Sequence, residues 1–137
     1  MPRVAAVTAV RKWVNAHPTL VGKGRPLLLG AHRARLRSPG QGAYVLLSRV
    51  GGSSALLAEE GVDRARVSGL ILAGTDEAAE LAATAYAAAL DALSGAPAAM
   101  GDATCLVADN VAGPLLIDGP GGNDQYAYAV DADFYLI

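Results

Sequence analysis

Hydrophobic and polar residues alternate along two long segments of the chain, which predicts two amphipathic β-strands. In residues 63–73 one face is polar and the other apolar: Arg64, Arg66 and Ser68 against Ala65, Val67 and Ile71. In residues 125–137 an aromatic or aliphatic side chain occupies every second position from Tyr126 to Leu136. Because successive side chains of a strand point to opposite faces, each segment has one face suited to a core.

Two other segments have the spacing of amphipathic helices. The first covers residues 3–16, where valine recurs at positions 4, 7, 10 and 14 and Pro18 ends the element. The second covers residues 76–94, with Thr75 as N-cap, acidic residues in the first turn and Gly95 as the expected C-cap. Its predicted apolar stripe consists of Ala78, Leu81, Ala82, Ala85, Ala89 and Leu93.

Shorter strands are predicted in the remaining segments. Residues 27–29, 33–37 and 43–50 precede the long helix, and residues 103–108 and 115–117 follow it. A turn is expected at residues 109–110 and a break at residues 113–114. This order of elements predicts an α+β fold, with a mixed, mostly antiparallel sheet and two helices packed on one face. We expect residues 1–137 to form a single domain.

Composition narrows the classes of protein that fit. Hydrophobic residues make up 53% of the chain and charged residues only 18%, against about 25% charged in an ordinary soluble domain. Few charges are left to cover the surface, which favours a chain partly buried by partners. We expect no membrane span, no cleaved leader and no disulfide, because apolar runs are short and Cys105 is the one cysteine.

Charge is separated by sign along the chain. Residues 1–58 hold nine Lys or Arg and no Asp or Glu, and residues 67–137 hold ten Asp or Glu and no Lys or Arg. The two halves could cancel within one chain, or present opposite patches that bind the next copy head to tail. We predict the second arrangement. The candidate subunit-interface residues are Arg33, Arg35, Arg37, Arg49, Arg64, Arg66, Asp131 and Asp133.

The arginine row at positions 33, 35 and 37 admits three interpretations: contact with protein, a solvated face, or contact with nucleic acid phosphates. Aromatic residues are only 5% of the chain and none is interleaved with this row, so stacking on single-stranded nucleic acid is poorly supported. We favour a protein contact.

No catalytic or metal-binding constellation is evident. His17 and His32 are interpreted as surface or capping residues, and Cys105 as a buried thiol. Residues 22–25 lack the spacing and the hydroxyl residue of a phosphate loop. Asp131 and Asp133 share a strand face, but no third ligand accompanies them. We therefore predict no enzymatic activity, no metal and no cofactor.

Three stretches resemble the tail terminator, or tail completion, proteins of long-tailed bacteriophages, particularly those of actinobacterial hosts. They are residues 66–93, residues 107–114 (VADNVAGP) and residues 128–137, the last containing VDADFY. They lie almost wholly in the second half of the chain, and none is a chemical motif. Residues 1–60 match only in size and in beginning with a helix.

The resemblance implies a structural virion protein that forms a ring, usually a hexamer. Such a ring caps the tail tube, ends its polymerisation and joins the tail to the head. Its implied partners are further copies of itself, the tail tube protein and the head–tail connector or stopper protein, with DNA passing through the lumen. It implies no cofactor and no membrane, and a location in the virion after assembly in the host cytoplasm. A connector or stopper protein, or a nucleic-acid-binding module, are the alternatives.

Overall fold

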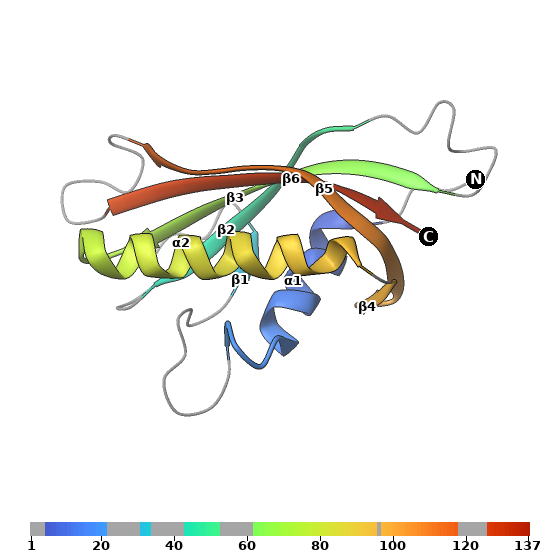
Figure 1. Cartoon of the computed structure of the whole chain (residues 1–137), viewed down its shortest axis with the longest axis horizontal. Helices are drawn as coiled ribbons and strands as arrows, with labels where there is room; N and C mark the ends of the chain where they lie inside the picture. Colours follow the sequence, from blue (N-terminus) through green and yellow to red (C-terminus); the bar gives the residue numbers. More distant parts are fainter. Residues whose placement is uncertain (1–4, 22–30, 34–42, 53–61, 96, 118–125) are drawn as a thin grey trace.

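The computed structural model describes residues 5–21, 31–33, 43–52, 62–95, 97–117 and 126–137. Within them, two α-helices and six strands follow one another along the chain (Figure 1). The elements are α1 (Ala6–Ala16), β1 (Ala31–Arg33), β2 (Tyr44–Gly51), β3 (Asp63–Ala73), α2 (Asp76–Asp91), β4 (Ala98–Met100), β5 (Ala103–Ile117) and β6 (Tyr126–Leu136). A 3-10 turn, Ala92–Ser94, extends α2.

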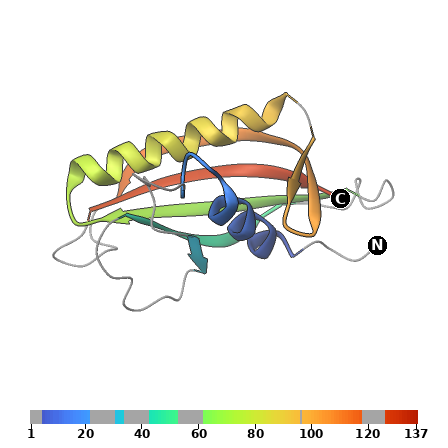
Figure 2. The same ribbon diagram turned by 90° about the horizontal axis from the view of Figure 1, so that it is seen from below.

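The strands form one sheet in the order β1-β2-β3-β6-β5-β4. β1 runs parallel to β2, and the other neighbouring pairs are antiparallel. Both helices lie on the same face of the sheet (Figures 1 and 2). The predicted α+β fold, a mixed and mostly antiparallel sheet with two helices on one face, is confirmed.

The centre of the sheet is the antiparallel pair β3–β6, whose register is unbroken from Asp63 opposite Leu136 to Ala73 opposite Tyr126. Ala65, Val67 and Ile71 of β3 are buried, as are the alternate side chains of β6 from Tyr128 to Leu136. Both strands were predicted from alternation alone. Their buried faces turn toward the helices and form the floor of the core.

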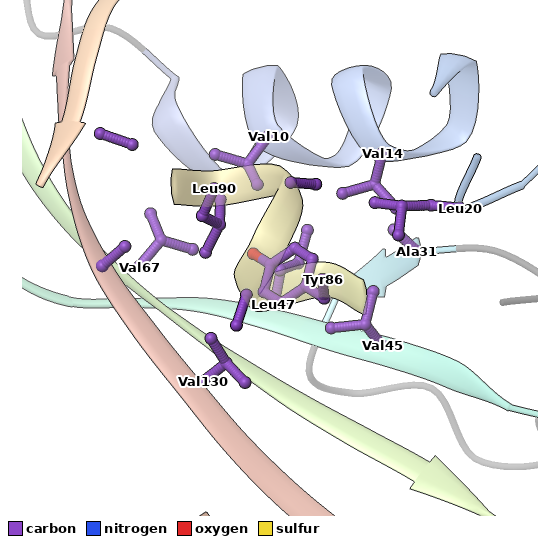
Figure 3. Packing of buried hydrophobic residues seen from close by; sticks show 14 of the residues in the cluster. Val10, Val14, Leu20, Ala31, Val45, Leu47, Val67, Tyr86, Leu90 and Val130 are labelled. Atoms are coloured by element: carbon purple, nitrogen blue, oxygen red, sulfur yellow. The ribbon is translucent and has the colours of Figure 1, made fainter. Parts of the chain in front are cut away.

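Tyr86 of α2 fills the middle of that core (Figure 3). Its ring lies over Gly69 of β3, where an added Cβ would come within 2.9 Å of Tyr86 Cε2. Figure 3 shows the ring among Val45, Leu47 and Val130. The Tyr86 hydroxyl is fully buried and has no hydrogen-bond partner among the described residues, and burial raises its pKa. Gly69 therefore provides the space in which the helix seats its largest side chain.

Helix α1 holds the short edge strand in place. Its buried residues are Ala6, Ala9, Val10 and Val14. The Asn15 amide accepts a hydrogen bond from the Ala31 N–H (2.8 Å) and donates one to the Ala31 carbonyl (3.4 Å). This two-point contact ties β1 to the end of α1. The predicted helix is confirmed over residues 6–16, and the predicted start at residues 3–4 lies outside the described residues.

Helix α2 begins as its sequence predicts. The Thr75 side chain accepts a hydrogen bond from the Ala78 N–H at 3.2 Å, and acidic residues fill the first turn. Gly95 is the C-cap of the 3-10 turn that extends the helix, as predicted, with φ −93°. One detail of the prediction was wrong. Leu81, placed in the apolar stripe, is 54% exposed, whereas Tyr86 and Leu90 are fully buried. Alanine occurs on all sides of this helix, so the sequence gives little indication of which face is buried.

Strand β5 corrects a second prediction. The turn expected at residues 109–110 and the break expected at residues 113–114 both lie inside one strand, Ala103–Ile117. The register of β5 against β6 shifts at these places, so the residues expected to end the strand form bulges in it. Asn110 and Gly113 have φ of 52° and 106°, and the Gly113-Pro114 peptide is cis.

The outcome for the shorter strands is mixed. Residues 43–50 are confirmed as β2, whereas β4 was not predicted. Of the strand predicted over residues 33–37, Arg33 ends β1 and the rest lies outside the described residues, as do residues 27–29. Neither described helix is both long and apolar enough to cross a membrane.

Candidate functional site

The sheet face opposite the helices is the surface on which most candidate residues lie. Side chains of β3 and β6 alternate between faces, and in their register Arg66 faces Asp133 and Ser68 faces Asp131. These side chains share the face that α1 and α2 do not cover. The two strands are adjacent in the sheet, although their residues are more than 60 positions apart in the chain.

Asp133 is the centre of the polar half of this face. It is 3% exposed and accepts hydrogen bonds from Arg64 Nη2 (3.0 Å), Arg66 Nη1 (3.2 Å) and Asn110 Nδ2 (2.9 Å). The Arg64 guanidinium also lies over the Tyr135 ring, 5.9 Å from its centroid. One buried carboxylate thus joins three adjacent strands, β3, β6 and β5, through charge-assisted contacts.

The same contacts set the ionisation of the network. Burial alone would raise the pKa of Asp133, but hydrogen bonds from Asn110, Arg64 and Arg66 outweigh it, and the pKa is lowered. The hydrogen bond and the charge of Asp133 raise the pKa of Arg64. The carboxylate is therefore ionised at neutral pH and is matched by positive charge.

A second ion pair joins β2 to β3. Arg49 donates two hydrogen bonds to Asp63, from Nη1 to Oδ2 at 3.0 Å and from Nη2 to Oδ1 at 3.1 Å. Asp63 is 4% exposed. This fork-to-fork geometry gives both charges a nearby partner within the same chain.

These two sets of contacts correct the electrostatic reasoning behind the predicted interface. Arg49, Arg64, Arg66 and Asp133 were expected to keep their charges for a neighbouring subunit, but each is paired within its own chain. The sheet brings the two halves of the sequence together, and the register of β3 with β6 places opposite charges side by side. Contact of these residues with another subunit stays a prediction. Unpaired charge is no longer an argument for it.

The other candidate interface residues have different outcomes. Asp131 is half-buried, and its Oδ1 is buried without a hydrogen-bond partner among the described residues. Arg33 is the last residue of β1, and Arg35 and Arg37 lie outside the described residues. The arginine row therefore stays a prediction.

The other half of the open face is apolar. Tyr44, Leu72 and Ala127 form a buried cluster separate from the main core. Leu46, Leu70 and Ile117 pack against it and are partly buried. Beyond this cluster, at the end of β5, Leu115 is exposed on the same face. The neighbouring exposed side chains of Leu116 and Tyr126 lie on the helix side of the sheet, because Leu116 is opposite Tyr128 and Tyr126 is opposite Ala73 of the core. This end of the sheet carries the largest share of exposed apolar side chains among the described residues.

Comparison with models of protein families, with curated proteins and with solved structures finds no match to this chain.

The residues considered for chemistry occupy structural positions. His17 caps α1: its Nδ1 accepts from the N–H groups of Thr19 (3.2 Å) and Leu20 (3.4 Å), and its ring packs edge-on against Trp13. Cys105 is buried, and burial raises its thiol pKa to about 11. Among the described residues no group of three His, Cys, Asp or Glu side chains is placed to hold a metal ion.

Two participants in the Asp133 network were missed. Asn110 was assigned to a turn, yet its left-handed backbone within β5 directs its amide to Asp133. Tyr135 lies opposite Arg64 in the β3–β6 register. The signal for Tyr135 was present in the alternation of its strand, but only the register identifies its partner.

Proposed function

We propose that this protein is a structural subunit of a bacteriophage virion that forms a ring on the tail tube, ends tube polymerisation and joins the tail to the head. The observation that carries the proposal is the spatial arrangement of the stretches that resemble tail terminator proteins. Residues 66–93 comprise most of β3 and all of α2, residues 107–114 lie in β5, and residues 128–137 lie in and directly after β6.

These stretches are neighbours in the fold. β3, β6 and β5 are consecutive strands of the sheet, and α2 packs on all three. A resemblance dispersed along the sequence thus falls on one continuous unit. Such a unit can keep its shape while the rest of the chain differs.

Surface features support an assembly role. A sheet face that neither described helix covers, and exposed leucines at one end of the sheet, are typical of surfaces that a partner covers. A ring requires a heterologous contact, in which two different surfaces of one subunit meet those of its neighbours and the rotation closes. Within this proposal the arginine row of residues 33, 35 and 37 is a second candidate contact.

The first test is the mass of the purified protein in solution, followed by electron microscopy. We expect a closed ring and, on mixing with tail tubes of a long-tailed phage of an actinobacterial host, a density at the tube end and an arrest of tube growth. Binding to portal complexes but not to tubes would instead identify a connector or stopper protein. A protein that binds neither, and shifts DNA on a gel in a salt-dependent way, would contradict the proposal.

A second test addresses the arginine row. Reversing the charge of Arg33, Arg35 and Arg37 together should weaken ring assembly if these residues meet acidic groups of a neighbour. The matched variant replaces the same three residues with lysine, which keeps the charge. Unchanged assembly in the reversed variant would remove the row from the interface.

A further inference from the structure

The two ends of the long axis carry complementary surfaces. At one end lie the last residues of β5, the first of β6 and the start of α2; at the other lie the start of α1, the turn between β4 and β5, and the end of β6 (Figures 1 and 2). β6 runs between them, and its 11 residues span about 33 Å. We call the first end the acidic apolar end and the second the alanine hollow.

The acidic apolar end combines exposed leucines with carboxylates. Leu115 and Leu116 of β5 are 62% and 53% exposed. Leu116 lies opposite Tyr128 in the β5–β6 register, and the Tyr128 hydroxyl donates a 2.6 Å hydrogen bond to Asp76 Oδ1 at the start of α2. That bond places the helix start on the same side of the sheet as Leu116, whereas Leu115 points to the opposite face. The exposed side chains of the first turns of α2 are Asp76, Glu77, Glu80 and Leu81.

The alanine hollow has the opposite shape and a different charge. It is a recess of about 210 Å³, with Ala5, Ala9, Ala103 and Ile137 in its wall. Lys12 and Asp102 stand at it and form an exposed pair at 3.6 Å. Lys12 is the one cation among the residues that line the recess, and α1 itself carries no acidic residue. A cavity of roughly 150 Å³ holds a benzene-sized group, so this recess has room for a leucine side chain.

We propose that the acidic apolar end of one copy binds the alanine hollow of the next copy, with the Leu116 side chain in the recess and the α2 carboxylates beside Lys12. The inference rests on the proposed function, because it names the contact through which the ring would close. The occupant is a second copy of this chain, since both the apolar surface and the charge that fit the recess lie on the same molecule. Two different surfaces meeting at opposite ends make a head-to-tail contact.

A charge exchange tests this contact directly. Lys12→Glu and Glu77→Lys should each weaken self-association by at least about tenfold, because each places like charges in contact. An equal mixture of the two variants offers one original and one exchanged pair of ends, both of opposite charge, and should assemble from alternating copies although neither variant assembles alone. The double variant, Lys12→Glu with Glu77→Lys, should restore assembly. Mass measurement by sedimentation over a range of concentrations distinguishes these states.

Controls separate the contact from folding. Leu116→Asp should disrupt assembly, whereas Val50→Asp, at a residue of similar exposure outside both surfaces, should not. Glu80→Lys replaces Glu77→Lys if circular dichroism shows that the latter is unfolded.

The outcomes separate this inference from the proposed function. Single variants that assemble like the wild type, or a wild type that stays monomeric, would overturn the head-to-tail contact. Neither result tests the proposed role at the tail, which is tested separately by binding to the ends of tail tubes. Conversely, rings that obey the charge exchange but ignore tail tubes would support the contact and overturn the proposed function.

Discussion

Asp133 shows how a single carboxylate can organise a sheet face. It is buried and ionised, and its stabilising partners come from both neighbouring strands: Arg64 and Arg66 from β3 and Asn110 from β5. A buried carboxylate without partners lowers the stability of the fold. Burial of Asp133 therefore depends on its hydrogen bonds to Arg64, Arg66 and Asn110. The network also links parts of the chain that are distant in sequence, because β3 and β6 are separated by α2, β4 and β5.

We predict that Asp133→Asn lowers the free energy of unfolding by about 1–3 kcal/mol, since two guanidinium groups lose their shared anion while keeping some contact with water. Asp131→Asn, two residues away on the same face, is the matched control and should change stability by less than about 0.5 kcal/mol. Denaturant unfolding of both variants measures the difference. Equal effects would show that the Asp133 contacts contribute nothing specific.

The ionisation of Asp133 predicts that the free energy of unfolding depends on pH in the acidic range. Its folded pKa is below the ordinary value of about 3.9, so the unfolded chain binds a proton more readily in that range. The stabilisation by Asp133 is complete at pH values above its ordinary, unfolded pKa. It is lost as the pH falls through its lowered, folded pKa. Between about pH 5 and pH 2, unfolding free energy should therefore fall more steeply in the wild type than in Asp133→Asn. Parallel curves would contradict this assignment.

Strand β5 is the element in which local chain geometry matters most. Its bulges carry positive φ angles at Asn110 and Gly113 and shift its register against β6. Apart from the three residues of β4, no described strand pairs with its outer edge. Bulges on such an edge increase twist and make pairing with another chain less favourable.

Gly113 gives this element a sharp test. A Cβ there would lie 2.3 Å from the Ala129 carbonyl oxygen, and φ is 106°. We expect Gly113→Ala to cost at least about 2 kcal/mol of stability, from the disfavoured backbone and the contact with a rigid neighbour. Gly74→Ala is the control, because an added Cβ at Gly74 meets nothing within 4 Å. Thermal unfolding of the two variants should separate them clearly; similar melting temperatures would refute the packing at Gly113.

The elements also show what the sequence could predict. β3 and β6 were identified because strict alternation is a local signal that tertiary packing did not override. Most of the apolar stripe predicted for α2 faces the core, but Leu81 was wrongly included and Tyr86 was missed. Alanine carries little information about burial, and the position of Tyr86 depends on the space above Gly69. The ends assigned within β5 were wrong because glycine, proline and asparagine mark bulges as well as turns.

The candidate site was harder to predict than the fold. Arg64, Arg66 and Asp133 were selected as charged residues of amphipathic strands, and their shared face was predictable from each strand alone. Their partnership was not, because the pairing of β3 with β6 and its register are properties of the whole sheet. The separation of charge along the sequence was therefore interpreted as a contact between chains, whereas folding had neutralised part of it within one.

At the scale of the whole molecule, the charged residues of the two helices take no part in the ion pairs of the sheet. The first turns of α2 expose Asp76, Glu77 and Glu80, and α1 carries Arg11 and Lys12. Exposed carboxylates thus gather beside Leu116 at one end of the subunit, whereas at the other end the recess has the Lys12–Asp102 pair in its wall. An elongated subunit with distinct ends is suited to contacts that repeat around a ring.

Such a contact would respond to salt in a way that separates its two components. Raising the salt concentration from about 0.1 M to about 1 M shortens the screening length from about 10 Å to about 3 Å, so the attraction between the α2 carboxylates and Lys12 of α1 should weaken. Sulfate strengthens apolar burial, so leucine packing in the alanine hollow should persist better in sulfate than in chloride. We therefore expect self-association to weaken in sodium chloride, and to weaken less in sodium sulfate of equal ionic strength. In Leu116→Asp the difference between the two salts should disappear; its persistence would place the apolar part of the contact elsewhere on the subunit.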